Sequence, residues 1–166
     1  MLTLALFLLA CWLALNWLSP LATLAAADPL SGGRVPAELL ERARALRARF
    51  YVANLTRGPG FSAWVWPRYI IVLDRTFLSR LTPEHVRFVM AHELGHVALG
   101  HLRWRCLAMT SGAALLPLVR RRLEAHEAAA DAYAELITGF KREHFDNSGR
   151  VVSQGGVNGR KSTGSS

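Results

Sequence analysis

Cysteine is scarce in this sequence. Only Cys11 and Cys106 occur among the 166 residues, and both stand in apolar stretches. Two such cysteines cannot build the disulfide network on which small secreted domains rely, so we expect two buried thiols. Internal repeats are absent too, and the chain has the length of one domain with a single core.

Charge is missing from the N-terminus. No charged residue occurs from Leu2 to Ala27, and 18 of these residues precede Pro20. A helix of that length can span a bilayer, so we expect residues 1–27 to form a transmembrane anchor. A signal peptide is the alternative, because the three alanines at 25–27 could form a cleavage site, although the n-region has no lysine or arginine.

Arginines become frequent directly after this segment, with five between residues 34 and 49. Basic residues mark the cytoplasmic side of a membrane span. We therefore expect a single-pass protein at the inner membrane of a bacterial cell, with its remaining domain in the cytoplasm. If the segment is cleaved, a secreted or periplasmic protein follows instead.

Acidic residues are fewer than basic ones. The chain has 20 lysines and arginines against 12 aspartates and glutamates, a net charge of +8. Such a surface favours anionic lipid headgroups, which predicts the lipid bilayer as a partner. Nucleic acid is the other partner that a basic protein suggests, but it is not expected here, because the arginines are dispersed and no recognition motif accompanies them.

The stretch AHELGHVALGH (91–101) has the pattern of a metal site. On a helix, His92 and His96 lie about 40° apart around the axis, and Glu93 falls in the same arc. The preceding Thr-Pro pair at 82–83 supports a helix, since threonine can cap it and proline suits its first turn. The pattern therefore indicates a core helix with a metal on one edge; the alternative is two core histidines bound to backbone carbonyls.

Glu93 indicates catalysis. A zinc ion held by His92 and His96 lowers the pKa of a bound water, and Glu93 can take the proton as general base. The resulting hydroxide attacks a peptide carbonyl polarised by the metal, so the predicted reaction is peptide-bond hydrolysis. A structural zinc site needs no such base, which distinguishes an enzyme from the alternative of a noncatalytic, zinc-stabilised scaffold that binds membranes.

A catalytic zinc requires a third protein ligand. His101 is the nearest candidate. If the helix continues, however, His101 points about 140° away from His96 and cannot share its metal. Only a sharp break of the helix at Gly100 would bring His101 back towards the metal.

A later helix offers a better candidate. Residues 120–137 are rich in alanine and leucine, which favour helix. Glu127 and Asp131 stand four apart there, so Glu127 can bind the metal while Asp131 holds a ligand histidine in its tautomer. Glu124 and His126 compete for the ligand role, but Glu124 has no acidic partner one turn later.

The run LTPEHVRFVMAHELGHVALGH (81–101), followed by EAAADAYAEL (127–136), resembles the membrane-associated zinc peptidases of the HtpX, CAAX prenyl protease and Oma type. These are gluzincins, which join an HExxH helix to a downstream ExxxD helix. The resemblance covers about residues 35–140. It implies one Zn²⁺ per chain and membrane-associated protein or peptide substrates, damaged ones among them. By the same resemblance the zinc ligands are His92, His96 and Glu127, the base is Glu93, and Asp131 supports the site.

Two features depart from this family. Ser62-Ala63 stands where members often have Asn-Ala, which bears on substrate positioning. Several members also cross the membrane between the two motifs, whereas residues 106–119 are too few, because a span needs about 20. We expect a buried or interfacial helix there, ending near Pro117.

A second family shares part of the pattern. Soluble regulatory peptidases of the ImmA/IrrE type also carry HELGH, followed by a helix with counterparts of Glu127, Tyr133 and Leu136. The HVALGH continuation, the LTPEH lead-in and the apolar N-terminus favour the first family.

Shorter elements precede the motif helix. YIIVLD (69–74) predicts a strand, with which residues 63–66 can pair. In gluzincins a strand at the edge of the cleft binds substrate through main-chain hydrogen bonds, and this segment is the candidate; a structural hairpin is the alternative. TRGPGFS (56–62) predicts a turn, and residues 36–52 predict a helix with arginines on its outer faces.

The predicted fold is α+β. After an N-terminal transmembrane helix, residues 34–144 form a minimal gluzincin-like zinc peptidase domain with an HExxH helix, a Glu-bearing helix and a small β-sheet. Residues 145–166, rich in glycine, serine and other polar residues, predict a disordered tail. The group that stabilises the oxyanion stays open among Tyr133, His126, His144 and an arginine at 120–122.

Overall fold

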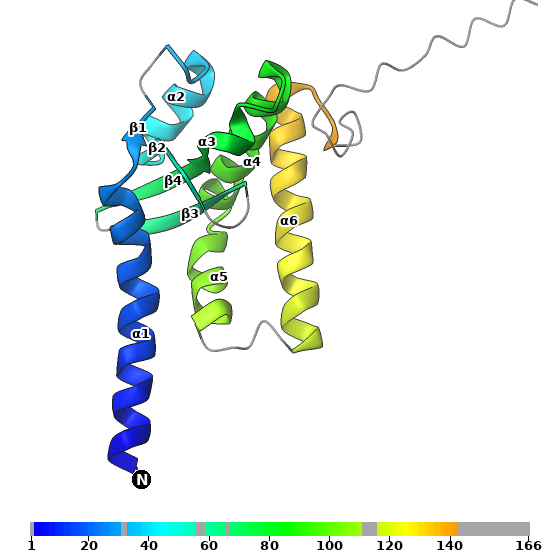
Figure 1. Cartoon of the computed structure of the whole chain (residues 1–166). Helices are drawn as coiled ribbons and strands as arrows, with labels where there is room; N and C mark the ends of the chain where they lie inside the picture. The colour runs from blue at the N-terminus through cyan, green and yellow to red at the C-terminus, as the bar shows by residue number, and fades with distance from the viewer. Residues whose placement is uncertain (1, 31–32, 56–58, 66, 111–115, 143–166) are drawn as a thin grey trace, which may run out of the picture.

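A computed structural model describes residues 2–30, 33–55, 59–65, 67–110 and 116–142. Helices and strands are mixed along this part of the chain, which confirms the predicted α+β class. Their order is α1 (Leu2–Ala25), β1 (Asp28–Pro29), α2 (Ala37–Ala45), β2 (Ala48–Ala53), β3 (Gly60–Val65), β4 (Arg68–Asp74), α3 (Arg75–Leu78), α4 (Pro83–Ala98), α5 (His101–Thr110) and α6 (Pro117–Thr138) (Figure 1).

The four strands form one sheet in the order β1-β2-β4-β3. β2 and β4 are parallel, while β3 runs antiparallel to β4 and pairs Ala63 with Ile70. The predicted strand at 69–74 is therefore confirmed, but it lies inside the sheet, and its residues 70–73 are buried. The edge strand next to it is β3, which begins at Gly60, earlier than the predicted start at residue 63. Trp66 lies outside the described residues.

The core lies between the sheet, α2, α4 and α6. Its buried side chains include Leu39, Phe50, Ile71, Met90 and Leu94. α6 runs alongside α4 (Figure 1), and the two helices make the most extensive contact between any pair of elements in the described chain. A methyl group added at Gly95 would lie 3.1 Å from Cδ1 of Tyr133, so the small residue permits this close approach.

α4 begins as its sequence predicts. The hydroxyl of Thr82 accepts a hydrogen bond from the His85 N–H at 3.3 Å, and Pro83 occupies the first turn, where a missing N–H costs nothing. The helix ends at Ala98, because Gly100 takes a left-handed conformation with φ of 69°.

The helix predicted over residues 36–52 is wrong in its second half. α2 ends at Ala45, and β2 begins at Ala48 after Arg47, which has φ of 54°. Residues 50–52 are Phe-Tyr-Val, which favour strands, and their pairing with β4 buries Phe50 and Val52. Burial in the sheet therefore outweighs the helical preference of the alanines and arginines.

The apolar interval at 106–119 also differs from expectation. Instead of one helix that ends near Pro117, α5 extends to Thr110 and α6 begins at Pro117, where proline suits the first position of a helix. Residues 111–115 lie outside the described chain. So do 56–58 of the predicted turn at 56–62, whose last three residues belong to β3, and the predicted tail at 145–166.

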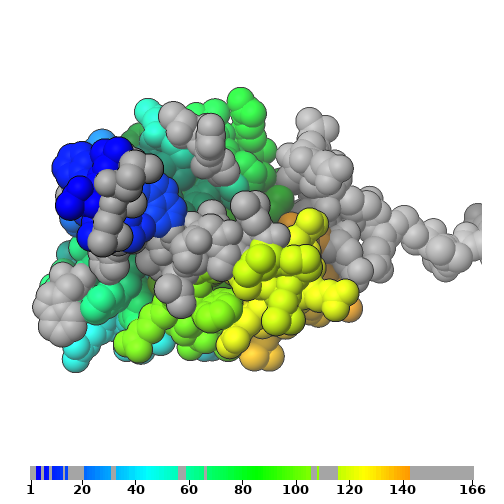
Figure 2. Space-filling model, turned by 90° about the horizontal axis from the view of Figure 1, so that it is seen from below, coloured from blue at the N-terminus to red at the C-terminus, as the bar shows by residue number. Residues whose placement is uncertain are grey.

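Residues 2–25 form α1, which extends from the sheet on the side to which α5 and the start of α6 also point (Figures 1 and 2). Within the described part of the chain, no helix combines the length and apolar character that a membrane crossing needs. The transmembrane helix predicted for residues 1–27 is therefore not shown.

Candidate metal centre

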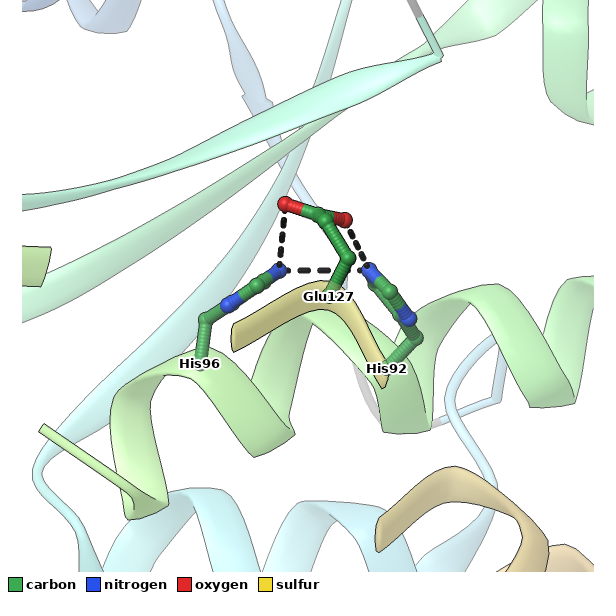
Figure 3. A group of neighbouring side chains, drawn as sticks. All are labelled: His92, His96 and Glu127. Carbon is green, nitrogen blue, oxygen red and sulfur yellow. Dashed lines mark hydrogen bonds and ion pairs between the residues drawn. The ribbon is translucent and has the colours of Figure 1, made fainter. Parts of the chain in front are cut away.

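Three side chains from two helices converge beside the sheet (Figure 3). α4 contributes His92 and His96, whose Nε2 atoms lie 3.2 Å apart. α6 contributes Glu127, with Oε2 at 3.3 Å from Nε2 of His92 and Oε1 at 3.5 Å from Nε2 of His96. The structure thus brings together the three residues that the sequence predicts as metal ligands.

The spacing of these atoms fits zinc. Zinc bonds to nitrogen and oxygen are about 2.0–2.2 Å long, and tetrahedral angles then place neighbouring ligand atoms about 3.3–3.6 Å apart. The two Nε2 atoms lie 3.2 Å apart, and each is 3.3 to 3.5 Å from a different oxygen of Glu127. With one ligand atom taken from each residue, all three atoms lie within 4.8 Å of one another, close enough to share one metal ion. Two imidazoles and one carboxylate also form a ligand set that leaves zinc a position for water.

Asp131 fixes the orientation of His92. Its Oδ1 lies 2.7 Å from Nδ1 of His92, and its Oδ2 accepts from Arg142 at 2.9 Å. A carboxylate accepts, so Nδ1 of His92 carries a proton, and Nε2, on the side of Glu127, is the nitrogen left to bind a metal. This is the contact predicted for Asp131 from its position one turn after Glu127.

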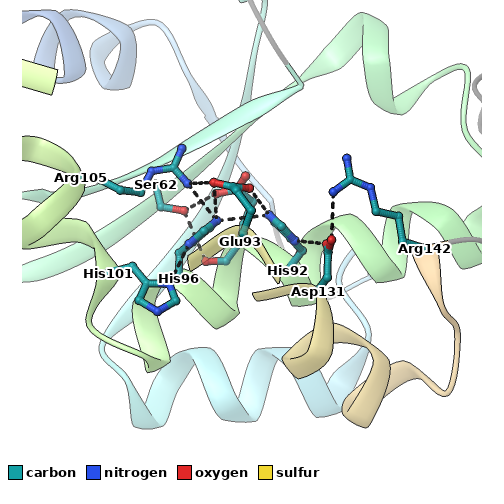
Figure 4. Close-up of polar contacts among 9 residues, drawn as sticks. Ser62, His92, Glu93, His96, His101, Arg105, Asp131 and Arg142 are labelled. Atoms are coloured by element: carbon teal, nitrogen blue, oxygen red, sulfur yellow. Dashed lines mark hydrogen bonds and ion pairs between the residues drawn. The ribbon is translucent and has the colours of Figure 1, made fainter. Parts of the chain in front are cut away.

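His101 lies next to His96, but it does not join the three donor atoms. Its Nδ1 is 3.1 Å from Nδ1 of His96 (Figure 4), whereas Glu127 lies at Nε2 of the same ring. The break at Gly100, on which a role for His101 depended, is present. It places His101 behind His96, where its ring stacks on His126 at 4.0 Å between centroids.

Glu93 is held from the sheet. The hydroxyl of Ser62, on β3, donates a hydrogen bond to the carboxylate of Glu93, and its oxygen lies 3.4 Å from the main-chain carbonyl oxygen of the same residue (Figure 4). The carboxylate is close enough to His92 to raise the pKa of that imidazole. No pattern in the sequence indicates this contact, because it depends on where β3 lies against α4.

Arg105 is a further neighbour that the sequence pattern did not indicate. Its Nη1 donates to Oε1 of Glu127 at 2.5 Å and lies 2.9 Å from Nε2 of His96. The guanidinium therefore lies among the atoms that would bind a metal, as a cation beside the Glu127 carboxylate and Nε2 of His96. Its position one turn after His101 on α5 is the signal that could have identified it.

The surroundings of the site shift several pKa values. The imidazoles of His92 and His96, in contact with the carboxylate, hold the pKa of Glu127 well below its usual range. Burial lowers the pKa of His92, but Glu127, Glu93 and Asp131 together outweigh this effect and raise it. Burial, with the nearby charges of His126, His96 and Arg105, lowers the pKa of His101 to about 4, so that its ring is neutral at neutral pH.

The remaining candidates lie elsewhere. Glu124 pairs with Arg120 at 3.0 Å on the exposed face of α6, and His126 stacks on His101. Among the residues considered for the oxyanion, Tyr133 packs on Gly95. Arg122 lies 4.3 Å above the ring of Trp104, and His144 is outside the described residues.

Comparison with known proteins gives one finding. The family model described as peptidase family M48 matches residues 33–144, which include all of the side chains above. Among curated proteins, no match to the chain is found.

Proposed function

The chain belongs to peptidase family M48, and from this premise we propose that it is a zinc-dependent metalloendopeptidase that hydrolyses peptide bonds in proteins. The observation that carries the proposal is the convergence of one donor atom each from His92, His96 and Glu127 within 4.8 Å, in a ligand set that suits zinc. These residues would hold one Zn²⁺ per chain. Bound zinc lowers the pKa of a water and polarises a carbonyl.

Glu93 is the general base in this proposal. Its carboxylate takes the proton from the attacking water and passes it to the leaving amine. The hydrogen bond from Ser62 keeps the carboxylate in one orientation, so that the proton acceptor does not have to be ordered during the reaction. Asp131 supports the site by holding His92 in the tautomer that has a free Nε2.

β3 is the candidate surface for the substrate. It is one of the two edge strands of the sheet, and the hydrogen bond from Ser62 joins it to the residue proposed as base. An extended peptide can pair with an open strand edge through main-chain hydrogen bonds, independently of its side chains. We infer that the substrate adds to β3, so that its scissile carbonyl lies beside the three donor atoms.

The membrane is the proposed location. Residues 2–27 carry no charge, and α1 exposes large apolar side chains, including Leu4, Leu6, Phe7 and Leu9. An exposed apolar surface of this kind is typical of a protein that binds a membrane or a partner. We propose that α1 anchors the domain at the cytoplasmic face of a bacterial inner membrane and that membrane proteins are cut during quality control. Recovery of the intact chain in the soluble fraction would contradict the anchor.

The test of the activity uses the full chain in detergent. Zinc content and casein hydrolysis are measured for wild type, Glu93→Gln and Glu127→Ala. The Glu93→Gln chain should retain zinc and lose hydrolysis. Its rate should fall by about 10²- to 10⁴-fold if only the proton transfer is lost. Alanine at 127 should lose both. Glu124→Ala is the matched control, because Glu124 is on the same helix and pairs with Arg120 away from the site.

Three outcomes would contradict the proposal in whole or in part. A wild-type chain that binds no zinc would remove the metal site. A chain that binds zinc stoichiometrically but cleaves no protein would favour the alternative of a noncatalytic, zinc-stabilised scaffold that binds membranes. Activity of an intact soluble chain on one regulatory protein alone would favour a peptidase of the ImmA/IrrE type.

A further inference from the structure

We propose that His101 is the hydrogen-bond acceptor that keeps His96 in its metal-binding tautomer. The inference rests on the metal site proposed above and assigns a positioning role to a residue outside the ligand set. It starts from one contact: Nδ1 of His96 lies 3.1 Å from Nδ1 of His101, and both side chains are buried. Two nitrogens at that distance share one proton, so one ring donates and the other accepts.

The direction of this hydrogen bond follows from Arg105. Its Nη1 lies 2.9 Å from Nε2 of His96, and a guanidinium has only donors. Nε2 of His96 must therefore accept, and a neutral imidazole that accepts at Nε2 carries its proton on Nδ1. That proton points at His101, whose Nδ1 accepts it. Binding of zinc through Nε2 of His96 requires the same tautomer, so the acceptor role of His101 is common to both states.

The two ligand histidines are thereby supported in matching ways. His92 donates from Nδ1 to Asp131 on α6, and His96 donates from Nδ1 to His101 on α5. In each ring Nε2 is therefore the nitrogen that faces Glu127 and can bind the metal. Acceptors of this kind orient ligand rings and raise their basicity, and their loss typically costs 10- to 100-fold in metal affinity.

The fold holds His101 in this position by a turn and a stack. Gly100, with φ of 69°, ends α4 and reverses the direction in which the next side chain points. A continuous helix would have placed His101 about 140° from His96. On its other side the His101 ring stacks on His126 at 4.0 Å, with only 3° between the planes, so its Nδ1 cannot rotate freely away from His96.

The test compares two replacements in the full chain. Asparagine at 101 keeps a polar acceptor near the position of Nδ1, whereas leucine of similar volume has none. Zinc affinity is measured by competition with a chromophoric chelator, beside Asp131→Asn, which alters the acceptor of the other ring. We expect His101→Leu to bind zinc 10- to 100-fold more weakly and His101→Asn to remain close to wild type.

A second measurement does not depend on any variant at 101. Long-range ¹H–¹⁵N spectra of the metal-free wild-type chain report which ring nitrogen of His96 carries the proton. Nδ1–H supports the proposal, and Nε2–H overturns it. Equal zinc affinity of wild type and His101→Leu would also overturn it, as would an asparagine variant as weak as leucine. A chain that binds zinc but cleaves nothing would contradict the proposed activity alone.

Discussion

Ser62 donates a hydrogen bond to the carboxylate of Glu93, although 31 positions separate the two residues. The contact joins the edge strand β3 to α4, the helix that carries both histidine ligands. The strand proposed to receive the substrate and the base proposed to activate water are therefore fixed relative to each other. A movement of β3 would change the geometry of both at once.

Replacement of Ser62 tests this link. Ser62→Ala should lower kcat by roughly tenfold or more and leave KM nearly unchanged, because a hydrogen bond to a charged group contributes about 1.5–3 kcal/mol. Peptide hydrolysis by the zinc-loaded chain measures both constants. Ser62→Thr is the control, since it keeps the hydroxyl on a strand that favours threonine, and it should restore most of the rate. A rise in KM with unchanged kcat would instead indicate a role in binding the substrate.

Arg105 should compete with the metal for its ligands. It donates to Nε2 of His96 and Oε1 of Glu127, and a metal ion needs the same lone pairs. Arg105→Met removes this competitor and leaves Glu127 without its cation. We expect the metal-free chain to unfold at a lower temperature and zinc to bind several-fold more tightly. Arg142→Met, which removes the neighbour of Asp131, is the control. Weaker zinc binding in Arg105→Met would contradict the expectation.

The metal-free chain should lose stability in weak acid. The pKa of His101 is about 4 in the folded chain and near 6.5 when unfolded, so between these values only the unfolded chain takes up the proton. The stability that neutral His101 contributes is complete above pH 6.5 and is lost as the pH falls towards 4. His126, whose pKa burial also lowers, acts in the same direction. The raised pKa of His92 acts oppositely, since its contribution is lost as the pH rises above 6.5.

Unfolding midpoints in chelator at pH 7.5 and pH 5 measure this effect. The unfolding midpoint of wild type should fall more between pH 7.5 and pH 5 than that of His101→Asn, because asparagine has no ring to protonate. An identical fall of the unfolding midpoint in wild type and in His101→Asn would contradict a lowered pKa of His101 in the folded chain.

Gly95 should tolerate no larger residue. A Cβ there would lie 3.1 Å from Cδ1 of Tyr133 and 3.3 Å from Cα of Ala130, so Gly95→Ala forces α4 and α6 apart. We expect a loss of about 1–3 kcal/mol in the free energy of unfolding, together with weaker zinc binding. Denaturant unfolding and chelator competition measure the two effects. Gly33→Ala is the control, because nothing lies within 4 Å of an added Cβ there. Unchanged zinc affinity in Gly95→Ala would mean that the distance between α4 and α6 does not determine the geometry of the metal site.

The elements that the sequence predicts well have strong local signals. Thr82 and Pro83 mark the start of α4, and the run at 69–74 is too rich in β-branched residues to be helix. The grouping of His92, His96 and Glu127 could also be predicted, since helical spacing and zinc chemistry limit the combinations. These inferences need no knowledge of how distant segments pack.

The other features depend on packing in three dimensions. β2 replaces the second half of the predicted helix because Phe50 finds a partner in Ile71 on β4, 21 positions later in the chain. The contacts of Ser62 and Arg105 require β3 and α5 to lie against α4, and no motif spacing encodes that arrangement. The contact of His101 with Nδ1 of His96 depends on the turn at Gly100, and the sequence leaves open whether the helix continues there.

The close contact at Gly95 has a consequence for the choice of ion. Glu127 lies on α6 three residues before Ala130, whose backbone presses on Gly95, so its distance from the two histidines is fixed by the contact between helices. Calcium bonds to oxygen at about 2.3–2.6 Å and gathers six to eight oxygen ligands. To fit such an ion, the helices would have to separate and lose their packing. Discrimination against larger, oxygen-seeking cations therefore comes from the distance between two backbones as well as from the chemistry of the three side chains.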